Sequence, residues 1–315
     1  MKQPWVICGG AGFLGSFVAD ALIEQSVPVV VIDNFFSGKK ENLKQAARSP
    51  LYRLVEQDIR ETGALTEVMR DLKPEAVIHL AAIHFIPAAM ANPPLTMSLN
   101  VHGTQSVLTS ARAAGVKRIW FASTGDVYEP SERPHSETSK LAPFNIYGLS
   151  KLMGEQLLQL ESRNDPSLRL IVGRLFNLIG PRETNPHILP EILSQLKKNP
   201  HSPLRLGSLW PKRDLVPVRE AARSIVEALK KAEPGLSTIN FATGVARSMQ
   251  EVIETLGEIR GKKIEVETDQ SKVRAVERPH LQADVSKLKA LIGITPSSDL
   301  KVALKELLIH EGMLS

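Results

Sequence analysis

Tyr147 and Lys151 are the side chains in this sequence with the clearest capacity for acid–base chemistry. They are four residues apart, so on a helix they share one face. An ammonium group beside a phenol favours the phenolate, and we expect the pKa of Tyr147 to lie well below its usual value of about 10. This spacing also occurs by chance in surface helices. It becomes informative because the beginning of the chain predicts a cofactor that needs such a base.

That cofactor is predicted by a glycine-rich turn between a strand at 5–8 and a helix that begins near residue 13. Glycine lets the backbone approach a pyrophosphate, and the helix N-terminus then faces the phosphates. A second strand ends in Asp33, in the position where an acid accepts hydrogen bonds from an adenosine ribose. Because an acid there repels a 2′-phosphate, the pattern predicts NAD rather than NADP. The glycines of the turn are Gly9, Gly12 and Gly15.

The elements that would position these residues alternate along the first part of the chain. Strands are expected at 5–8, 29–32, 51–55, 76–80, 118–121 and 168–172, and helices at 62–72, 95–114 and 147–161. The alternation predicts an α/β fold with a doubly wound parallel (Rossmann) sheet. Ligands of such sheets bind at the carboxyl ends of the strands. The residues expected there are Asp58, Ile59, Leu80, Ala81, Ala82, Ser123 and Thr124.

The alternation weakens after residue 176, and prolines become frequent. We expect an NAD-binding domain over 1–176 and a smaller α/β substrate lobe over 177–315, part of which returns to the first domain. Helices in this lobe are expected at 188–198, 219–231, 249–260, 285–291 and 300–308, and strands at 238–241 and 264–267.

Composition limits the class of protein. The 315 residues are 43% hydrophobic and 23% charged, as in ordinary globular enzymes. The only cysteine, Cys8, excludes an intramolecular disulfide, and a cytoplasmic location is expected. The net charge of +5 suits an anionic ligand. Basic residues form no long runs and no apolar run approaches the roughly 20 residues of a membrane span, so neither nucleic acid nor membrane is an expected partner.

Taken together, these segments resemble the extended short-chain dehydrogenase/reductase family. The resemblance is to its NAD-dependent nucleotide-sugar epimerases and dehydratases, UDP-glucose 4-epimerase-like proteins among them, and covers nearly the whole chain. It rests on residues 9–15, 33–34, 37–38, 58–59, 79–82, 100–104 and 123–124, on Tyr147 with Lys151, and on 174–177 and 180–182. Weaker matches are Gly207, Arg213, Asp214, Asp284, Ser286 and Lys287.

The resemblance implies a role for each matching residue. Tyr147 takes a proton from a sugar hydroxyl, Lys151 lowers the pKa of Tyr147 and holds the nicotinamide ribose, and Thr124 hydrogen-bonds the same oxygen. The hydride passes to tightly bound NAD and gives a 4-ketosugar. Implied cofactor contacts are Gly9, Gly12, Phe13, Leu14, Gly15, Asp33, Asn34, Ser37, Gly38, Asp58, Ile59, Leu80, Ala81, Ala82, Asn100, Ser123, Tyr147, Lys151 and Phe176.

A nucleotide-diphosphate sugar is the implied substrate. Its diphosphate would contact Asn177, Arg213 and Arg278, since the planar fork of arginine suits phosphate. His84 is expected either to line the sugar pocket or to be structural, and His79 to be a packed strand-end residue. The resemblance also implies a homodimer formed through the helices at 95–114 and 147–161.

The step that follows oxidation depends on residues 123–129. Dehydratases of the family resemble Thr-Asp-Glu there, with two acids that remove water, and nucleotide-glucuronate decarboxylases resemble Thr-Ser-Glu. This chain has Gly125 in place of the first acid and Asp126 at the position of the base. Glu129 replaces the family's usual glycine, for which the sequence offers no reason. Gly125 favours 4-epimerisation.

Two alternatives stay open at the level of sequence. One is a dehydratase or decarboxylase that uses Asp126 as a second base. The other is a catalytically silent NAD-sensing regulator, against which the presence of Thr124, Tyr147 and Lys151 argues.

Overall fold

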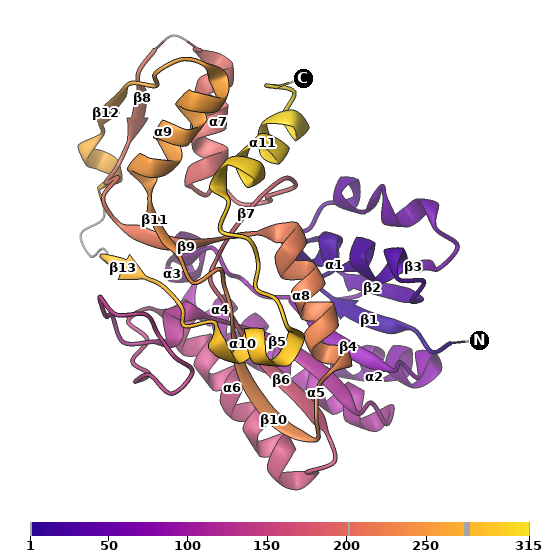
Figure 1. Ribbon diagram of the computed structural model, residues 1–315. Coiled ribbons are helices and arrows are strands. Elements are labelled where there is room, and N and C mark those ends of the chain that lie inside the picture. Colours follow the sequence, from indigo (N-terminus) through magenta and orange to yellow (C-terminus); the bar gives the residue numbers. More distant parts are fainter. Residues whose placement is uncertain (1, 201, 274–277, 315) are drawn as a thin grey trace.

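A seven-stranded sheet forms the centre of the computed structural model, which describes residues 2–200, 202–273 and 278–314 (Figure 1). The strand order is β10-β6-β5-β4-β1-β2-β3, and every neighbouring pair is parallel. The strands are β1 (Trp5–Cys8), β2 (Val29–Asp33), β3 (Tyr52–Glu56), β4 (Ala76–His79), β5 (Arg118–Thr124), β6 (Arg169–Leu175) and β10 (Gly235–Phe241). This architecture confirms the predicted doubly wound α/β fold.

Helices cover both faces of the sheet, because both faces of its central strands are apolar. Within β1, Trp5 and Ile7 join one hydrophobic core while Val6 and Cys8 join the other. The first core is closed by α1 (Phe13–Glu24), α8 (Val218–Lys230) and α10 (Ser286–Ile292). The second is closed by α2 (Thr62–Leu72), α5 (Gly103–Ala113) and α6 (Ile146–Asn164).

Strands β5 and β6 both run three residues beyond their predicted ends. They pair in parallel as far as Thr124 opposite Leu175, so Ser123 and Thr124 end the strand instead of following it. Because Ser123 and Thr124 are polar, a pattern of apolar residues does not extend the predicted strand over them. The Ser123 hydroxyl is buried and donates to the Glu155 carboxylate of α6, which satisfies it inside the sheet.

The single helix predicted over 95–114 was wrong in detail. The segment consists of the end of α4 (Pro93–Met97), a π-helical stretch at Ser98–His102, and α5, and a further short helix, α3 (Ile86–Ala91), precedes it. The wider π turn carries Asn100, whose side chain accepts a hydrogen bond from the Ile83 amide and donates to the Ile83 carbonyl and the Ser150 hydroxyl. π turns are frequent at functional sites.

A smaller lobe stands at the carboxyl edge of the main sheet (Figure 1). It contains β7 (Asn177–Ile179), α7 (Ile188–Lys198), β8 (Leu204–Leu206), β9 (Lys212–Pro217), β11 (Ala246–Ser248), α9 (Met249–Arg260), β12 (Val266–Thr268), β13 (His280–Leu281) and α11 (Leu300–His310). Strand β9 pairs with β7, β11 and β13, and β8 pairs with β12. Helices α7, α9 and α11 share a separate hydrophobic core.

The chain crosses between the two parts more than once. After β9, helix α8 packs on α1 and strand β10 joins the edge of the main sheet beside β6. No helix among the described residues is long and apolar enough to cross a membrane.

Candidate active site

One continuous cleft of about 1480 Å³ runs along the carboxyl edge of the main sheet, beneath the smaller lobe. Ligand pockets are usually about 300–1,000 Å³, so this cleft has room for two ligands, such as a dinucleotide and a nucleotide sugar. Every residue predicted to contact cofactor or substrate lines it except Asn100. The residues that the sequence assigned to the site therefore line one cleft.

The glycine-rich turn is fixed by close backbone packing. Gly9 has a φ of +85°, and a Cβ on it would lie 2.6 Å from the Ala81 amide nitrogen. A Cβ on Gly15 would lie 2.3 Å from the Gly9 carbonyl oxygen. The turn ends at Gly12, the N-cap of α1, which leaves the first amides of that helix without a capping side chain. Such a helix start is a site for a phosphate anion.

Two carboxylates at the ends of β2 and β3 stand further along the cleft. Asp33 accepts hydrogen bonds from the amides of Ala11 (2.9 Å) and Phe35 (2.8 Å), and burial raises the pKa of Asp33. Asp58 accepts hydrogen bonds from the Arg60 guanidinium and from Asn34. Those bonds lower the pKa of Asp58 to about 2. Both acids are held in place and can accept from a ligand only with the lone pairs that remain.

Asn100 lies behind the cleft, not on its surface. It is fully buried, and its amide joins the Ile83 backbone to Ser150 on α6. It therefore positions the cleft wall and the Tyr147 helix.

Tyr147 and Thr124 both line the cleft, and the Thr124 hydroxyl is close enough to affect the pKa of Tyr147. Burial and the nearby Asp126 carboxylate raise the pKa of Tyr147, while the Thr124 hydrogen bond lowers it. The net shift is upward, contrary to the expectation from sequence, because removing a phenolate from water costs more than one hydroxyl hydrogen bond returns. Ionisation of Tyr147 therefore depends on positive charge close to it.

Lys151 is 2% exposed, and its ammonium nitrogen lies 5.0 Å from the centre of the Phe121 ring. Burial lowers the pKa of Lys151 to about 7. The lysine can therefore exchange its proton near neutral pH, where a free lysine would remain charged.

A buried ion pair fixes the helix that carries Tyr147. Arg174 on β6 makes two hydrogen bonds to Glu155 on α6, of 2.9 and 2.7 Å, and both side chains are buried. Arg174 also donates to the Tyr128 hydroxyl (3.0 Å), which in turn bonds Asn240. This network ties α6 to the ends of β5, β6 and β10.

The turn after β5 is closely packed at Gly125. A Cβ there would lie 3.3 Å from side-chain atoms of both Phe176 and Leu281, so these side chains would have to shift by a few tenths of an ångström. Arg278 donates to the carbonyls of Gly125 (3.1 Å) and Tyr128 (2.6 Å) and is 4% exposed. Its guanidinium therefore braces this turn at the wall of the cleft.

The other predicted substrate residues take different positions. Asn177 begins β7 and is exposed toward the cleft, and Arg213 on β9 is half-buried at its wall. Glu129 forms an exposed ion pair with Lys140 at 2.8 Å, which ties two parts of the loop after β5 together.

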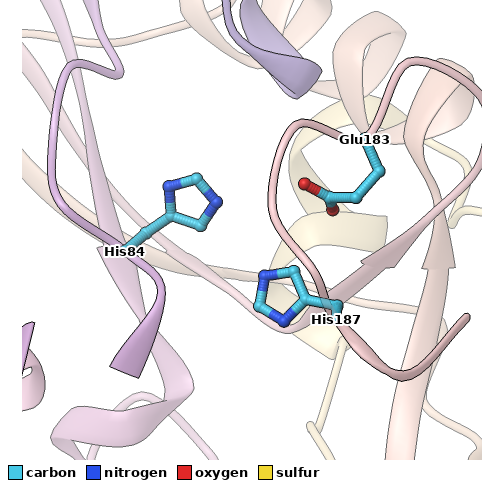
Figure 2. A group of neighbouring side chains, drawn as sticks. All are labelled: His84, Glu183 and His187. Atoms are coloured by element: carbon cyan, nitrogen blue, oxygen red, sulfur yellow. The ribbon is translucent and has the colours of Figure 1, made fainter. Parts of the chain in front are cut away.

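His79 is fully buried and hydrogen-bonds the Thr104 hydroxyl at 3.0 Å, as expected for a packed residue. His84 instead lines the cleft, where burial, together with nearby His187 and Lys151, lowers the pKa of His84 to about 4. Its neighbours Glu183 and His187 come from the loop after β7 and were missed from sequence (Figure 2). The four-residue spacing of that acid and histidine was their only signal.

The comparisons with known proteins agree with this geometry. The model of the NAD-dependent epimerase/dehydratase family matches residues 5–242. The chain belongs to this family. The UDP-glucose 4-epimerase of Azospirillum brasilense is 30% identical over 312 residues, with 93% of this chain and 87% of that protein covered.

Solved structures of the family have the same fold over their full length. UDP-glucose 4-epimerase of Thermotoga maritima with UDP-glucose superposes with a TM-score of 0.87 at 28% identity, covering 98% of both chains. UDP-N-acetylglucosamine 4-epimerase of Methanobrevibacter ruminantium, in complex with UDP-N-acetylmuramic acid, gives 0.87 at 26% identity, covering 99% of both. The chain is thus an NAD-dependent enzyme of the UDP-sugar 4-epimerase type, which sets aside the silent regulator.

Proposed function

We propose that this enzyme inverts C4 of a UDP-linked sugar through a transient 4-ketosugar. The observation that carries the proposal is that Thr124, Tyr147 and buried Lys151 line one cleft, with Tyr147 and Lys151 on the same helix. Bound NAD would accept the hydride from C4 and return it to the opposite face. The glycine-rich turn would hold its pyrophosphate, and Asp33 its adenosine ribose.

In this proposal the protein moves one proton at one oxygen. Tyr147 takes the proton of the C4 hydroxyl as the hydride leaves, and Thr124 stays hydrogen-bonded at that oxygen. Burial and the Asp126 carboxylate oppose ionisation of Tyr147, so Lys151 supplies the positive charge that stabilises the phenolate. Asn177 and Arg213 at the cleft wall would bind the diphosphate. Arg278, whose fork is directed at backbone carbonyls, would support the turn beneath the sugar.

Incubation with a panel of UDP-sugars, read by mass spectrometry and NMR, tests the proposal. A product of unchanged mass with inverted C4 supports it. Loss of one water would overturn it and identify a dehydratase that uses Asp126 as its second base. Gly125 favours the first result, because 4,6-dehydration lacks its acid at that position.

We also propose that two copies associate through α5 and α6. Leu149 and Leu160 are eleven residues apart, three turns of α6, so they lie on one face, and they are 42% and 52% exposed. Sedimentation equilibrium is expected to give twice the chain mass, and Leu160→Glu to shift it toward the monomer. A monomeric wild-type protein at micromolar concentration would contradict this.

A further inference from the structure

Three potential metal ligands from two separate segments converge at one side of the cleft (Figure 2). His84 follows β4, whereas Glu183 and His187 lie in the loop between β7 and α7. One nitrogen of each histidine and one oxygen of the glutamate lie within 4.8 Å of one another. All three residues are half-buried and line the cleft, so the space between them is reachable from it.

Neighbouring groups already hold each of the three side chains. Nε2 of His84 accepts a hydrogen bond from the amide nitrogen of Asn185 (3.1 Å), and the Ala82 backbone hydrogen-bonds the same ring, so a metal ion on this imidazole replaces one of these bonds. The His187 ring stacks near that of His84, with centroids 6.0 Å apart, and meets the edge of Phe85 at 5.1 Å. Oε1 of Glu183 accepts hydrogen bonds from the amides of Thr184 (2.8 Å) and Asn185 (3.0 Å). Its other oxygen can then serve a further partner.

We propose that His84, Glu183 and His187 bind a divalent transition-metal ion, of which Zn²⁺ is the best fit. Two imidazoles and one carboxylate are the protein ligands of open zinc sites, whereas Mg²⁺ and Ca²⁺ select oxygen ligands alone. With bonds of about 2.0–2.1 Å, ligand atoms around tetrahedral Zn²⁺ are about 3.4 Å apart. Side-chain rotation can bring atoms that are at most 4.8 Å apart to that spacing.

The fourth coordination position of this site opens into the cleft. Water fills it in the free enzyme, and a diphosphate oxygen of a bound UDP-sugar replaces that water. This second statement rests on the proposed function, whereas metal binding itself does not.

The test is titration of metal-free protein with Zn²⁺ by calorimetry, and with Co²⁺ read by its visible absorption. One ion per chain is expected. His84→Ala and His187→Ala are expected to weaken binding at least about 100-fold, and Glu183→Gln at least about 10-fold. Glutamine can still accept the two backbone hydrogen bonds, so this variant removes the charge while it preserves the turn. His102→Ala, the same substitution at an exposed position, is the matched control and is expected to bind as the wild type does.

Two results would overturn the site: folded wild-type protein that takes up no Zn²⁺, or undiminished uptake by both His84→Ala and Glu183→Gln. Thermal melting of each variant shows that it is folded. UDP added to the Zn²⁺-loaded protein is expected to tighten Zn²⁺ binding several-fold, and an unchanged affinity would overturn the diphosphate contact. The site and the proposed function fail separately, because Zn²⁺ uptake without turnover removes only the function, and turnover without uptake removes only the site.

Discussion

At the scale of single residues, the proposed chemistry depends on how charge is balanced around Tyr147. The tyrosine is buried, the Asp126 carboxylate raises its pKa, and the nearby Thr124 hydroxyl lowers it. The two features that raise its pKa keep the proton on the phenol until positive charge is close. Such an arrangement couples the base to the ligands of the cleft, because the phenolate forms readily only when they are in place.

Tyr147→Phe removes the proton acceptor and keeps the ring. Turnover is expected to fall by about 10²–10⁴-fold, the usual contribution of a positioned acid–base group, while NAD stays bound. Steady-state kinetics and the absorbance of released NAD measure the two effects. Tyr52→Phe, at a half-buried tyrosine on β3, is the control and is expected to keep full turnover. Unchanged activity in Tyr147→Phe would remove the catalytic assignment.

Asp126→Asn tests the electrostatic argument. The carboxylate raises the pKa of Tyr147, so its neutral replacement lowers that pKa, and the limb of kcat/KM that reports Tyr147 moves to lower pH. An epimerase is expected to keep most of its turnover at neutral pH, since Asp126 takes no proton from the sugar in the proposed step. Near-complete loss of activity with an unshifted pH profile would instead assign a second base.

The sequence predicted which residues line the cleft, but not the properties of those residues that burial decides. The glycine turn, Asp33 and the pair Tyr147 and Lys151 are readable because their spacing follows helix and strand periods. The direction of the Tyr147 pKa shift was wrong, because burial and the position of Asp126 come from tertiary packing. The Glu183 and His187 pair was missed because its third member, His84, is about a hundred residues away in sequence.

At the scale of elements, α6 must approach the turn after β5 closely for Thr124 to reach Tyr147. Gly148 is at the contact: a Cβ there would lie 2.6 Å from the Asp126 carbonyl oxygen and 3.0 Å from Pro143. The first of these neighbours is backbone and cannot rotate away. The helix and the turn are therefore in contact only because residue 148 has no side chain.

Gly148→Ala is expected to push α6 away from the turn. Turnover falls at least about tenfold, and stability falls by about 1–3 kcal/mol, as is typical for overpacking. Kinetics and urea unfolding measure both. Gly63→Ala on α2, where a Cβ would have no atom within 4 Å, is the matched control and is expected to keep activity and to keep or raise stability. Equal behaviour of the two variants would contradict the close contact.

The elements themselves were predicted nearly to the residue where the apolar period is clear, as in α2, α7 and α9. The predicted boundaries were wrong where hydrogen bonds between residues distant in sequence determine the local structure. The π turn at 98–102 is stabilised by the Asn100 bonds to residue 83, which no local pattern reports. Similarly, β5 extends to Ser123, whose hydroxyl finds its partner, Glu155, on α6.

At the scale of the whole molecule, the C-terminal part of the chain closes over the loop that follows β5. His135 in that loop donates its amide to the Gln282 carbonyl and accepts at its own carbonyl from the Asp284 amide, both at 2.8 Å. Its ring is 2% exposed and stacks on Tyr128 at 4.6 Å. Burial, together with the positive charges of Arg278 and His280, lowers the pKa of His135 to about 4.

This histidine makes the stability of the whole chain depend on pH. An unfolded histidine has a pKa of about 6.5, so between about pH 6.5 and 4 the unfolded state binds more protons than the folded one, and stability falls as the pH falls. His135→Phe keeps a stacked ring and removes the titration. Urea unfolding at pH 7 and pH 4.5 is expected to show a loss smaller than that of the wild type by roughly 1–3 kcal/mol. His102→Phe, at an exposed site, should lose as much as the wild type. If His135→Phe did so too, the closure of the C-terminal segment would not depend on a neutral histidine.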